Sequence, residues 1–184
     1  MKIAVIPAKG KSKRLANKNM RIINNKPMIN YSISYAERST MLDDIYISTD
    51  SQLIASHVKK LGHKVIMRPV TLGGEIPIIE VYKHALASIS NSIDIEFLYG
   101  LQPDHPDRKI ECDKVINFFI SNEADRLFSK DKLGEKNGAH YIISKYFFDN
   151  MQSRKDIFII DNCTNVHYEK DIEAATQNLK KKND

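Results

Sequence analysis

The sequence of 184 residues lacks tryptophan, has only two cysteines, and contains no apolar run close to the roughly 20 residues that a membrane-spanning helix needs. Cys112 and Cys163 form no Cys-x-x-Cys motif and no secretory signal precedes them, which predicts a protein of the reducing cytoplasm. The sequence also has no basic segment interleaved with Phe or Tyr, which argues against nucleic-acid binding despite the net charge of +5. We therefore expect a soluble, cytoplasmic protein with no membrane and no nucleic-acid partner.

Acidic residues are absent from the N-terminal stretch, where Glu37 is the first carboxylate of the chain. An apolar segment from Ile3 to Pro7 reads there as a buried strand that opens into a loop from Ala8 to Asn19. A loop with so much positive charge predicts a strongly anionic ligand, such as a nucleoside triphosphate, although a solvated basic turn is the alternative. The cations of the stretch are Lys2, Lys9, Lys11, Lys13, Arg14, Lys18, Arg21 and Lys26.

Apolar runs of strand length alternate with segments of helical periodicity, a pattern typical of an α/β fold with a mostly parallel sheet. The length predicts a single domain over residues 1–184, and the charged segment Ser129 to Gly138 reads as a loop within it. The predicted strands are Ile3 to Ile6, Ile45 to Ser48, Val65 to Met67, Ile95 to Leu101, Tyr141 to Ile143 and Ile157 to Ile160. The predicted helices are Met28 to Arg38, Gln52 to Leu61, Pro77 to Ile89, Cys112 to Ile120 and Glu169 to Leu179.

Two common phosphate-binding motifs do not account for the first loop. Gly10-Lys11-Ser12 resembles the end of a Walker A motif, but Val5 occupies the position where that motif requires its first glycine. The sequence also has no Gly-x-Gly-x-x-Gly motif for a dinucleotide. In open α/β sheets, ligands bind beyond the carboxyl ends of the strands, so the loops after these strands are where we expect the functional residues.

Several short blocks follow one another in order along most of the chain. Together they resemble the acylneuraminate-type CMP-sugar synthetases, cytidylyltransferases that activate sialic acid and related ulosonic acids, with Lys9 where that family has arginine. The first block is Ile6-Pro7-Ala8-Lys9-Gly10-Lys11-Ser12-Lys13 with Lys18-Asn19, and the others are Lys26-Pro27-Met28-Ile29, Ser48-Thr49-Asp50, Arg68-Pro69, Glu80-Val81-Tyr82-Lys83-His84-Ala85-Leu86, Leu101-Gln102-Pro103-x-x-Pro106-x-Arg108 and Asn137-Gly138-Ala139-x-Tyr141-Ile142.

The resemblance implies a three-layer, Rossmann-like nucleotidyltransferase fold of the glycosyltransferase-A type. It implies that Lys13 and Lys9 are catalytic because they neutralise the triphosphate, and that Gln102 and Arg108 bind the sugar substrate. Phosphoryl transfer needs mainly charge neutralisation, which lysines supply as mobile point charges. The implied nucleotide-binding residues are Ala8, Lys9, Gly10, Ser12, Lys13, Lys18, Asn19 and Arg68.

The metal-binding residues depart from the family pattern. The chain has Asp104 within Gln102-Pro103-Asp104-His105-Pro106, and this aspartate resembles the Mg²⁺ ligand of the KDO cytidylyltransferases. The sialic-acid enzymes have an Asp-x-Asp motif where this chain has Asn165-Val166-His167, so His167 and the nearby Asp161 are the remaining candidates for metal ligands. The resemblance thus implies Mg²⁺ as the cofactor, with Asp104, Asp161 and His167 as its candidate ligands.

The resemblance implies an enzyme that transfers CMP from CTP to an ulosonic, sialic-acid-like sugar and releases pyrophosphate. The alternative is a catalytically impaired nucleotide-binding relative that acts as a regulatory or partner subunit, and a third reading is transfer of another nucleotide to a sugar phosphate. A homodimer is also implied. The chain is short between Arg108 and Asn137, however, where the family places the excursion that reaches the partner subunit.

Overall fold

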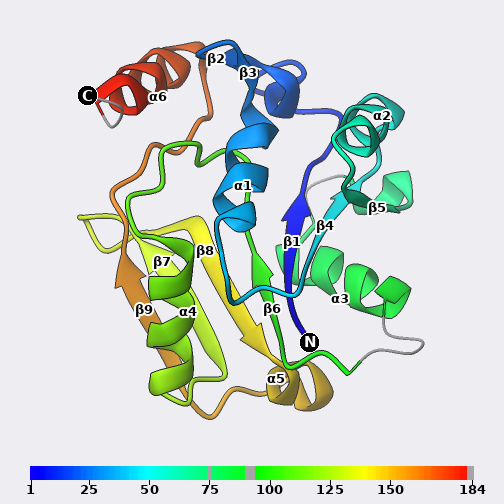
Figure 1. Ribbon diagram of the computed structural model, residues 1–184, viewed down its shortest axis with the longest axis vertical. Helices are drawn as coiled ribbons and strands as arrows, with labels where there is room; N and C mark the ends of the chain where they lie inside the picture. Colours follow the sequence, from blue (N-terminus) through cyan, green and yellow to red (C-terminus); the bar gives the residue numbers. More distant parts are fainter. Residues whose placement is uncertain (74–75, 90–93, 182–184) are drawn as a thin grey trace.

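The computed structural model describes residues 1–73, 76–89 and 94–181 and contains a seven-stranded sheet covered by helices on both faces (Figure 1). Of these strands, β8 alone runs antiparallel to its neighbours, which confirms the predicted α/β fold with a mostly parallel sheet. In spatial order the strands are β5 (Lys64–Met67), β4 (Asp44–Thr49), β1 (Lys2–Pro7), β6 (Phe97–Gly100), β8 (Lys136–Ser144), β7 (Arg126–Lys130) and β9 (Asp156–Ile160).

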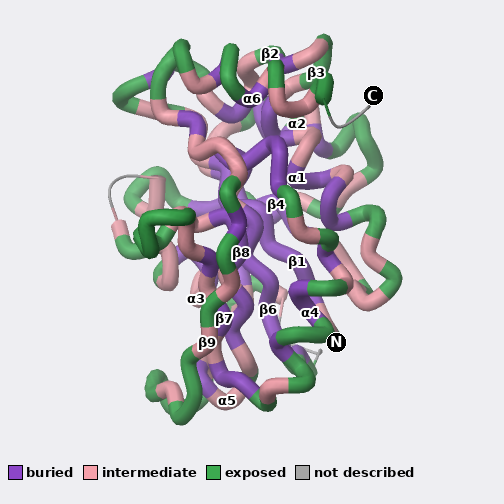
Figure 2. The backbone as a smooth tube through the Cα atoms, turned by 90° about the vertical axis from the view of Figure 1, so that its left-hand side faces the viewer, coloured by how far each residue is buried: buried purple, intermediate pink, exposed green. Residues whose placement is uncertain are grey.

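Strand β1 lies in the middle of the parallel half of the sheet, between β4 and β6. Its side chains alternate between two cores, because successive residues of a strand point to opposite faces. Ala4 and Ile6 belong to one core and Ile3 and Val5 to the other, and all four are fully buried. This double burial explains why β1 reads as a continuous apolar run, and in Figure 2 the central strands form the buried interior of the molecule.

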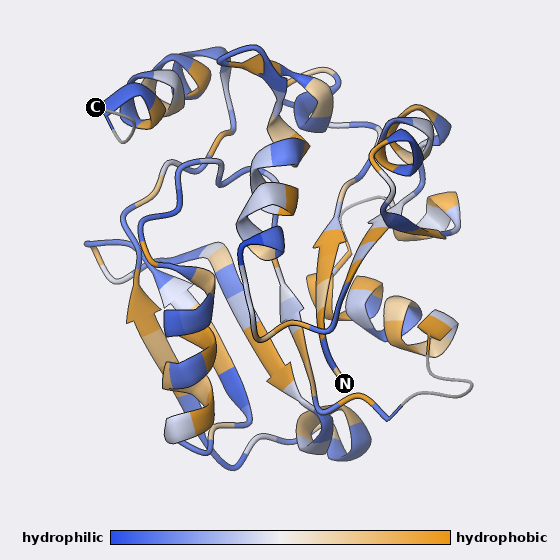
Figure 3. Cartoon of the chain, in the orientation of Figure 1, coloured by the Kyte–Doolittle hydropathy of each residue, from blue (hydrophilic) through white to orange (hydrophobic). Residues whose placement is uncertain are grey.

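Helices α1 (Met28–Glu37), α2 (Gln52–Lys60) and α4 (Cys112–Ser121) pack on one face, and α3 (Ile78–Ile89) and α5 (Lys145–Asn150) pack on the other. Helix α2 begins where predicted, because the Ser51 side chain accepts a hydrogen bond of 3.4 Å from Ile54 N. It ends before Gly62, whose φ of 84° is the left-handed conformation that glycine tolerates. In Figure 3 the hydrophobic colour gathers on the strands and on the sheet-facing parts of these helices.

A third, smaller core joins the two ends of the chain. Helix α6 (Glu169–Lys181) packs through Ile172 and Ala175 against Leu15 of the first loop and against Ile23 of β2 (Ile22–Ile23), which pairs with β3 (Lys26–Pro27). Figure 1 shows α6 beside this small ribbon, at the end of the sheet to which β1 points. The C-terminal helix therefore supports the first loop from outside.

The structure differs from the sequence prediction mainly between residues 123 and 151. The segment Ser129 to Gly138, expected to be a loop, is largely a hairpin in which Lys130 of β7 pairs with Lys136 of β8. Strand β7 escaped prediction because its sequence, Arg-Leu-Phe-Ser-Lys, is short and has a charge at each end. Helix α5 is too short to show a clear helical period. None of the helices in the described residues is long and apolar enough to cross a bilayer.

Asp125 ties β7 to the segment before β9. The carboxylate accepts hydrogen bonds from the backbone N–H, Nε and Nη2 of Arg154 at 2.7, 3.0 and 2.7 Å, and its side chain is 2% exposed. These bonds to Arg154 lower the pKa of Asp125 to about 2, against the opposing effect of burial. The stabilisation is therefore present above the ordinary aspartate pKa of about 4 and is lost as the pH falls toward 2.

We predict that Asp125→Asn lowers the free energy of unfolding by about 2 kcal/mol at pH 7 because several charge-assisted hydrogen bonds are weakened. Urea unfolding at pH 7 and pH 2.5 measures this. The difference between wild type and variant should shrink at the lower pH, whereas the exposed Asp149→Asn should change stability little at either pH. An equal difference at both pH values would contradict the assignment.

Candidate functional site

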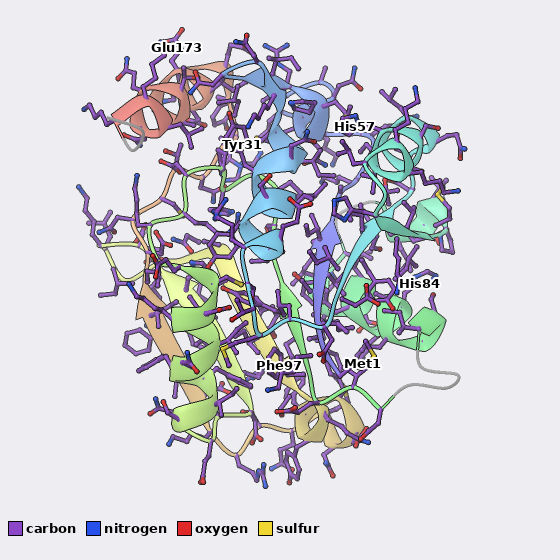
Figure 4. All side chains as sticks on the ribbon, viewed as in Figure 1. Met1, Tyr31, His57, His84, Phe97 and Glu173 are labelled. Carbon is purple, nitrogen blue, oxygen red and sulfur yellow. The ribbon has the colours of Figure 1, made fainter. Side chains whose placement is uncertain are left out.

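A cavity of about 310 Å³ lies beyond the carboxyl ends of β1, β5 and β6. This is the end of an open α/β sheet where ligands bind, and it is opposite the end marked by Met1 and Phe97 in Figure 4. Five cationic side chains line the cavity, and Asp104 is the one carboxylate among the described residues that line it. The full lining is Pro7, Lys9, Ser12, Lys13, Arg14, Lys18, Asn19, Arg68, Leu72, Gly73, Ile76, Ile78, Val81, Gln102, Pro103, Asp104 and His167.

The structure brings together most of the residues that the sequence placed in the site. The first loop lines the cavity with Lys9, Ser12, Lys13, Lys18 and Asn19. Asn19 Nδ2 donates a hydrogen bond of 2.9 Å to the carbonyl of Lys9. The cross-loop bond holds the two ends of the cationic segment together. From other strand ends, the cavity receives Arg68, Gln102, Asp104 and His167.

Ala8 and Gly10 shape the first loop and do not line this cavity. The backbone N–H of Ala8 donates to the carbonyl of Ser48 at 2.8 Å, and that of Gly10 donates to Asp50 Oδ1 at 2.7 Å. A Cβ atom on Gly10 would lie 2.7 Å from Cβ of Ser51, too close for any side chain without a shift of the loop. The requirement for glycine here comes from the packing of the loop on the start of α2.

Arg68 follows β5 and is only 6% exposed. Its Nε and Nη1 atoms are buried and have no hydrogen-bond partner among the described residues. Burial lowers the pKa of the guanidinium, and the negative charge of Asp50 opposes this shift. A buried cation whose donors are unused is costly, and an anion in the cavity would remove that cost.

Asp104 lies after β6 and pairs with Lys18, whose Nζ is 2.6 Å from Oδ2. Burial raises the pKa of Asp104, but the contacts with His105 and Lys18 lower it more and hold this pKa well below its usual range. The Nδ1 atom of His105 lies 3.1 Å from Oδ1 of Asp104. The carboxylate is therefore ionised at pH 7. Lys18 Nζ also lies 3.3 Å from the carbonyl of Val166, while Val166 N donates to the carbonyl of Asp104 at 2.9 Å.

The Asp104 carboxylate fits the requirements of Mg²⁺. Its Oδ1 is buried and, apart from the 3.1 Å contact with His105 Nδ1, has no partner in the described part of the chain. Within the described residues there is no group of three or more His, Cys, Asp and Glu side chains that could form a metal cage. Mg²⁺ commonly takes one or two protein carboxylates together with phosphate oxygens and water, so a single aspartate beside a cationic loop is a suitable donor set.

His167 lines the cavity, but its ring is a poor ligand for Mg²⁺, which prefers oxygen. Burial and the positive charge of Lys18 lower the pKa of this histidine, so the ring is neutral at pH 7. Its backbone N–H donates to Asp171 Oδ2 at 2.8 Å, which fixes the start of α6. We assign His167 a place in the wall of the cavity.

The structure places Asp161 outside the cavity, which corrects its proposed position as a metal ligand. Asp161 is fully buried, and its Oδ2 accepts hydrogen bonds from His140 Nε2 at 2.8 Å and from the backbone N–H groups of Lys109 and Ile110 at 3.1 and 3.3 Å. Burial lowers the pKa of His140 to about 4, so this imidazole is neutral at pH 7. A carboxylate used in this way joins β9 to the loop before α4.

Arg108 also lies outside the cavity, contrary to its predicted contact with the sugar substrate. It is 3% exposed, and its guanidinium donates hydrogen bonds to groups of the protein interior. The sequence prediction was based on an arginine in the correct block, but the block does not reveal on which side of the loop the side chain packs.

The sequence reasoning missed one cation and several apolar groups of the site. Arg14 lines the cavity beside Lys13, and its membership in the same cationic run was the available signal. Ile78 and Val81 contribute an apolar wall from the start of α3, and nothing in their pattern distinguishes them from core residues. His84, which belongs to one of the family-like blocks, is half-buried on α3 and does not line the cavity (Figure 4).

Residues 3–106 match the model of the family described as cytidylyltransferase, and this match covers more than half of the chain. The chain belongs to the cytidylyltransferase family. The matched region contains all the strands of the parallel half of the sheet and every cavity residue named above except His167. The expected family is thereby confirmed.

Relatives of this cytidylyltransferase-family chain include the N-acylneuraminate cytidylyltransferase of Escherichia coli, 35% identical over 107 residues, which are 58% of this chain and 25% of the relative. The 3-deoxy-manno-octulosonate cytidylyltransferase of Thermodesulfovibrio yellowstonii is 30% identical over 135 residues, 73% of this chain and 53% of the relative. The matches thus span a quarter to about half of the length of these relatives.

The fold is also similar to a solved structure of CMP:2-keto-3-deoxy-manno-octonic acid synthetase complexed with CTP. The TM-score is 0.78 over 98% of this chain and 99% of that chain, at 12% sequence identity. At this identity the likeness shows the fold alone, and it confirms the expected nucleotidyltransferase architecture.

Proposed function

We propose that the protein transfers CMP from CTP to an ulosonic acid and releases pyrophosphate. The observation that carries the proposal is the charge of the cavity: among the described lining residues there are five cations and one carboxylate, and Nε and Nη1 of the buried Arg68 have no hydrogen-bond partner there. Such a site suits a ligand with several negative charges. Membership in the cytidylyltransferase family supports CTP as that ligand, and the sialic-acid and octulosonate relatives support an acidic sugar as the acceptor.

In the proposed reaction, a hydroxyl oxygen of the sugar attacks the α-phosphorus of CTP and loses its proton to solvent. The bond from this phosphorus to the bridging oxygen breaks, and pyrophosphate leaves with that oxygen. Lys9 and Lys13 neutralise the phosphate oxygens and the leaving group. Arg68 and Asn19 orient the nucleotide, and Gln102 contacts the acceptor. Because little covalent chemistry is required of the protein, positioning and charge account for most of the rate.

Mg²⁺ is the proposed cofactor, and Asp104 is the residue that would hold it. When bound, the ion neutralises negative charge on the phosphate oxygens and helps to orient them. The pairing of Lys18 with Asp104 fixes the direction of the carboxylate. A homodimer remains a prediction, which sedimentation velocity of the purified chain would test.

A catalytically impaired, nucleotide-binding subunit is the second candidate. The observation in its favour is that His167 stands in the cavity wall where a carboxylate was expected and that Asp161 is turned into the core. Such a protein would bind CTP through the cationic loop without turning it over. A third candidate, transfer from another nucleotide, shares the phosphate-binding loop and differs in the base.

The decisive experiment combines calorimetry with a pyrophosphate-release assay. CTP, UTP and GTP are each tested with N-acetylneuraminic acid, KDO and a panel of other ulosonic acids, with and without Mg²⁺. The proposal expects release with CTP, an ulosonic acid and Mg²⁺ together. Tight CTP binding without release over the panel would favour the impaired subunit, release with UTP or GTP would favour the third candidate, and no nucleotide binding would exclude all three.

The unused donors of Arg68 lead to a prediction in which stability and binding change in opposite directions. Arg68→Met removes a buried cation whose Nε and Nη1 donors have no hydrogen-bond partner among the described residues, so the free energy of unfolding without ligand should rise by about 1 kcal/mol. The same change should raise the Kd of CTP at least about tenfold, since the anion loses a charge-assisted bond. Urea unfolding and calorimetry measure the two effects.

The matched control for this prediction is Arg38→Met, which alters an exposed arginine outside the cavity. It should leave the CTP affinity unchanged. A parallel loss of stability and affinity in Arg68→Met would mean that Arg68 serves the fold and that its donors are satisfied in solution.

A further inference from the structure

The interior side chain of Arg108 contacts the loop that carries two of the site residues. Its Nη2 donates to the carbonyl of Gln102 and its Nη1 to the carbonyl of His105, each at 2.6 Å. The same guanidinium donates through Nη1 to Ser32 Oγ on α1 and through Nε to the carbonyl of Ala139 on β8, both at 2.9 Å. One buried group therefore connects the loop to a helix and a strand.

The two loop carbonyls bracket the residues that face the cavity. Gln102 begins this segment and His105 ends it, with Pro103 and Asp104 between them. The carbonyls of Gln102 and His105 are both bound by the planar guanidinium of Arg108. A guanidinium has its donors in a rigid fork, which fixes the separation of the carbonyls that it binds. The position of the Asp104 carboxylate follows from this spacing.

Strand β8 supports the side chain of Gln102 from the same direction. Gly138 has φ of 78°, and a Cβ atom there would lie 2.7 Å from Gln102 Nε2. Asn137 Oδ1 accepts a hydrogen bond of 3.1 Å from Ala139 N, which stabilises this local bend. Arg108 thus holds the backbone of the loop while Gly138 leaves the space that the Gln102 amide occupies.

We propose that Arg108 is a positioning residue that acts through Gln102 and Asp104 and touches neither the nucleotide nor the sugar. The proposal rests on the proposed function, since it assigns Arg108 to the placement of Gln102, the acceptor contact, and of Asp104, the residue that would hold Mg²⁺. The cations of the nucleotide side belong to the first loop and to Arg68, whereas the hydrogen bonds of the Arg108 guanidinium described above go to the Gln102–His105 loop, α1 and β8. Altering Arg108 should therefore separate acceptor use from nucleotide affinity.

The experiment compares wild type, Arg108→Lys and Arg108→Met. Lysine keeps the charge but cannot hold both carbonyls in a fork. We therefore expect kcat/KM for the acceptor to fall about 100-fold, because a small misplacement of a reacting group lowers the rate by about this factor. The Kd of CTP, measured by calorimetry without Mg²⁺, should stay within about threefold. Arg108→Met, which removes every donor, should show the same split with a larger loss.

Hydrogen exchange supplies a readout that needs no turnover. Val166 N–H is bonded to the carbonyl of Asp104, whereas Leu101 N–H is bonded to Val5 in the sheet. In Arg108→Lys, exchange at Val166 should accelerate at least about tenfold while exchange at Leu101 stays unchanged. A uniform acceleration over the chain, or none at Val166, would overturn the proposal.

The control is Asp125→Asn, which weakens the far end of the sheet without touching the loop. It should lower the unfolding temperature but leave the acceptor KM, the CTP Kd and exchange at Val166 as in wild type below the transition. If Arg108→Lys behaves like this control, the proposal fails. If wild type binds CTP but uses no ulosonic acid, the proposed function fails, and the exchange measurement still decides the role of Arg108.

Discussion

Replacing Lys13 with alanine is expected to lower kcat/KM for pyrophosphate release by about 1000-fold, because a preorganised charge at the developing negative charge of the transition state is lost. Lys13 lines the cavity from the loop after β1, where Lys9 and Arg14 add to the same field. The remaining cations preserve part of the ground-state attraction for CTP. The Kd of CTP should therefore rise less than kcat falls, which steady-state kinetics and calorimetry together would show.

The control for this variant is Lys11→Ala. Lys11 belongs to the same loop and has an exposed side chain, but it does not line the cavity. Its removal should change kcat/KM less than about threefold, since its charge lies outside the cavity and is screened there by solvent and salt. If Lys11→Ala and Lys13→Ala cause equal losses, the loop acts only through its overall charge and no specific contact of Lys13 is involved.

Replacing Asp104 with asparagine is expected to lower kcat/KM about 100-fold and to raise the Mg²⁺ concentration for half-maximal rate at least about tenfold. Asparagine keeps the size of the side chain and one oxygen, but it loses the negative charge that pairs with Lys18 and attracts a hard cation. The freed Lys18 also adds uncompensated positive charge to the cavity. Mg²⁺ titrations of the initial rate measure both effects.

Asp161→Asn is the discriminating partner of this experiment, because the sequence marked both aspartates as metal ligands and the structure separates them. Asp161 binds His140 and two backbone N–H groups, so its variant should lose about 2 kcal/mol of stability. The folded variant should keep the Mg²⁺ response of wild type. A shifted Mg²⁺ response in Asp161→Asn, with none in Asp104→Asn, would move the metal to the other aspartate.

The sequence was sufficient for the parallel half of the fold. Strands such as β1 are buried on both faces, so their apolar runs are long and clear. The half with β7 and β8 was harder, because charged residues end its short strands and its pairing depends on contacts across a hairpin. Local pattern carries little information about such contacts.

The residues of the candidate site also fall into those that could be predicted from the sequence and those that could not. Lys9, Lys13 and Asn19 are neighbours in one loop, so their proximity could be predicted from the chain itself. Asp161 and Arg108 also follow strands in promising motifs, but a motif does not say whether a side chain faces the cavity or the core. That choice is made by distant groups, such as His140 for Asp161 and Ser32 for Arg108.

The support of the first loop by α6 and the bond from Val166 to Asp104 have a consequence for biosynthesis. A ribosome delivers the N-terminal strands and the lysine-rich loop well before the segment that closes the wall of the cavity. While Val166 is still inside the ribosome, the nascent chain exposes Leu15 and Met28 to water. It also lacks the hydrogen bond from Val166 N that anchors the Asp104 loop. Nucleotide affinity and resistance to proteolysis should thus be acquired together, only after the segment that contains Val166 and α6 has emerged.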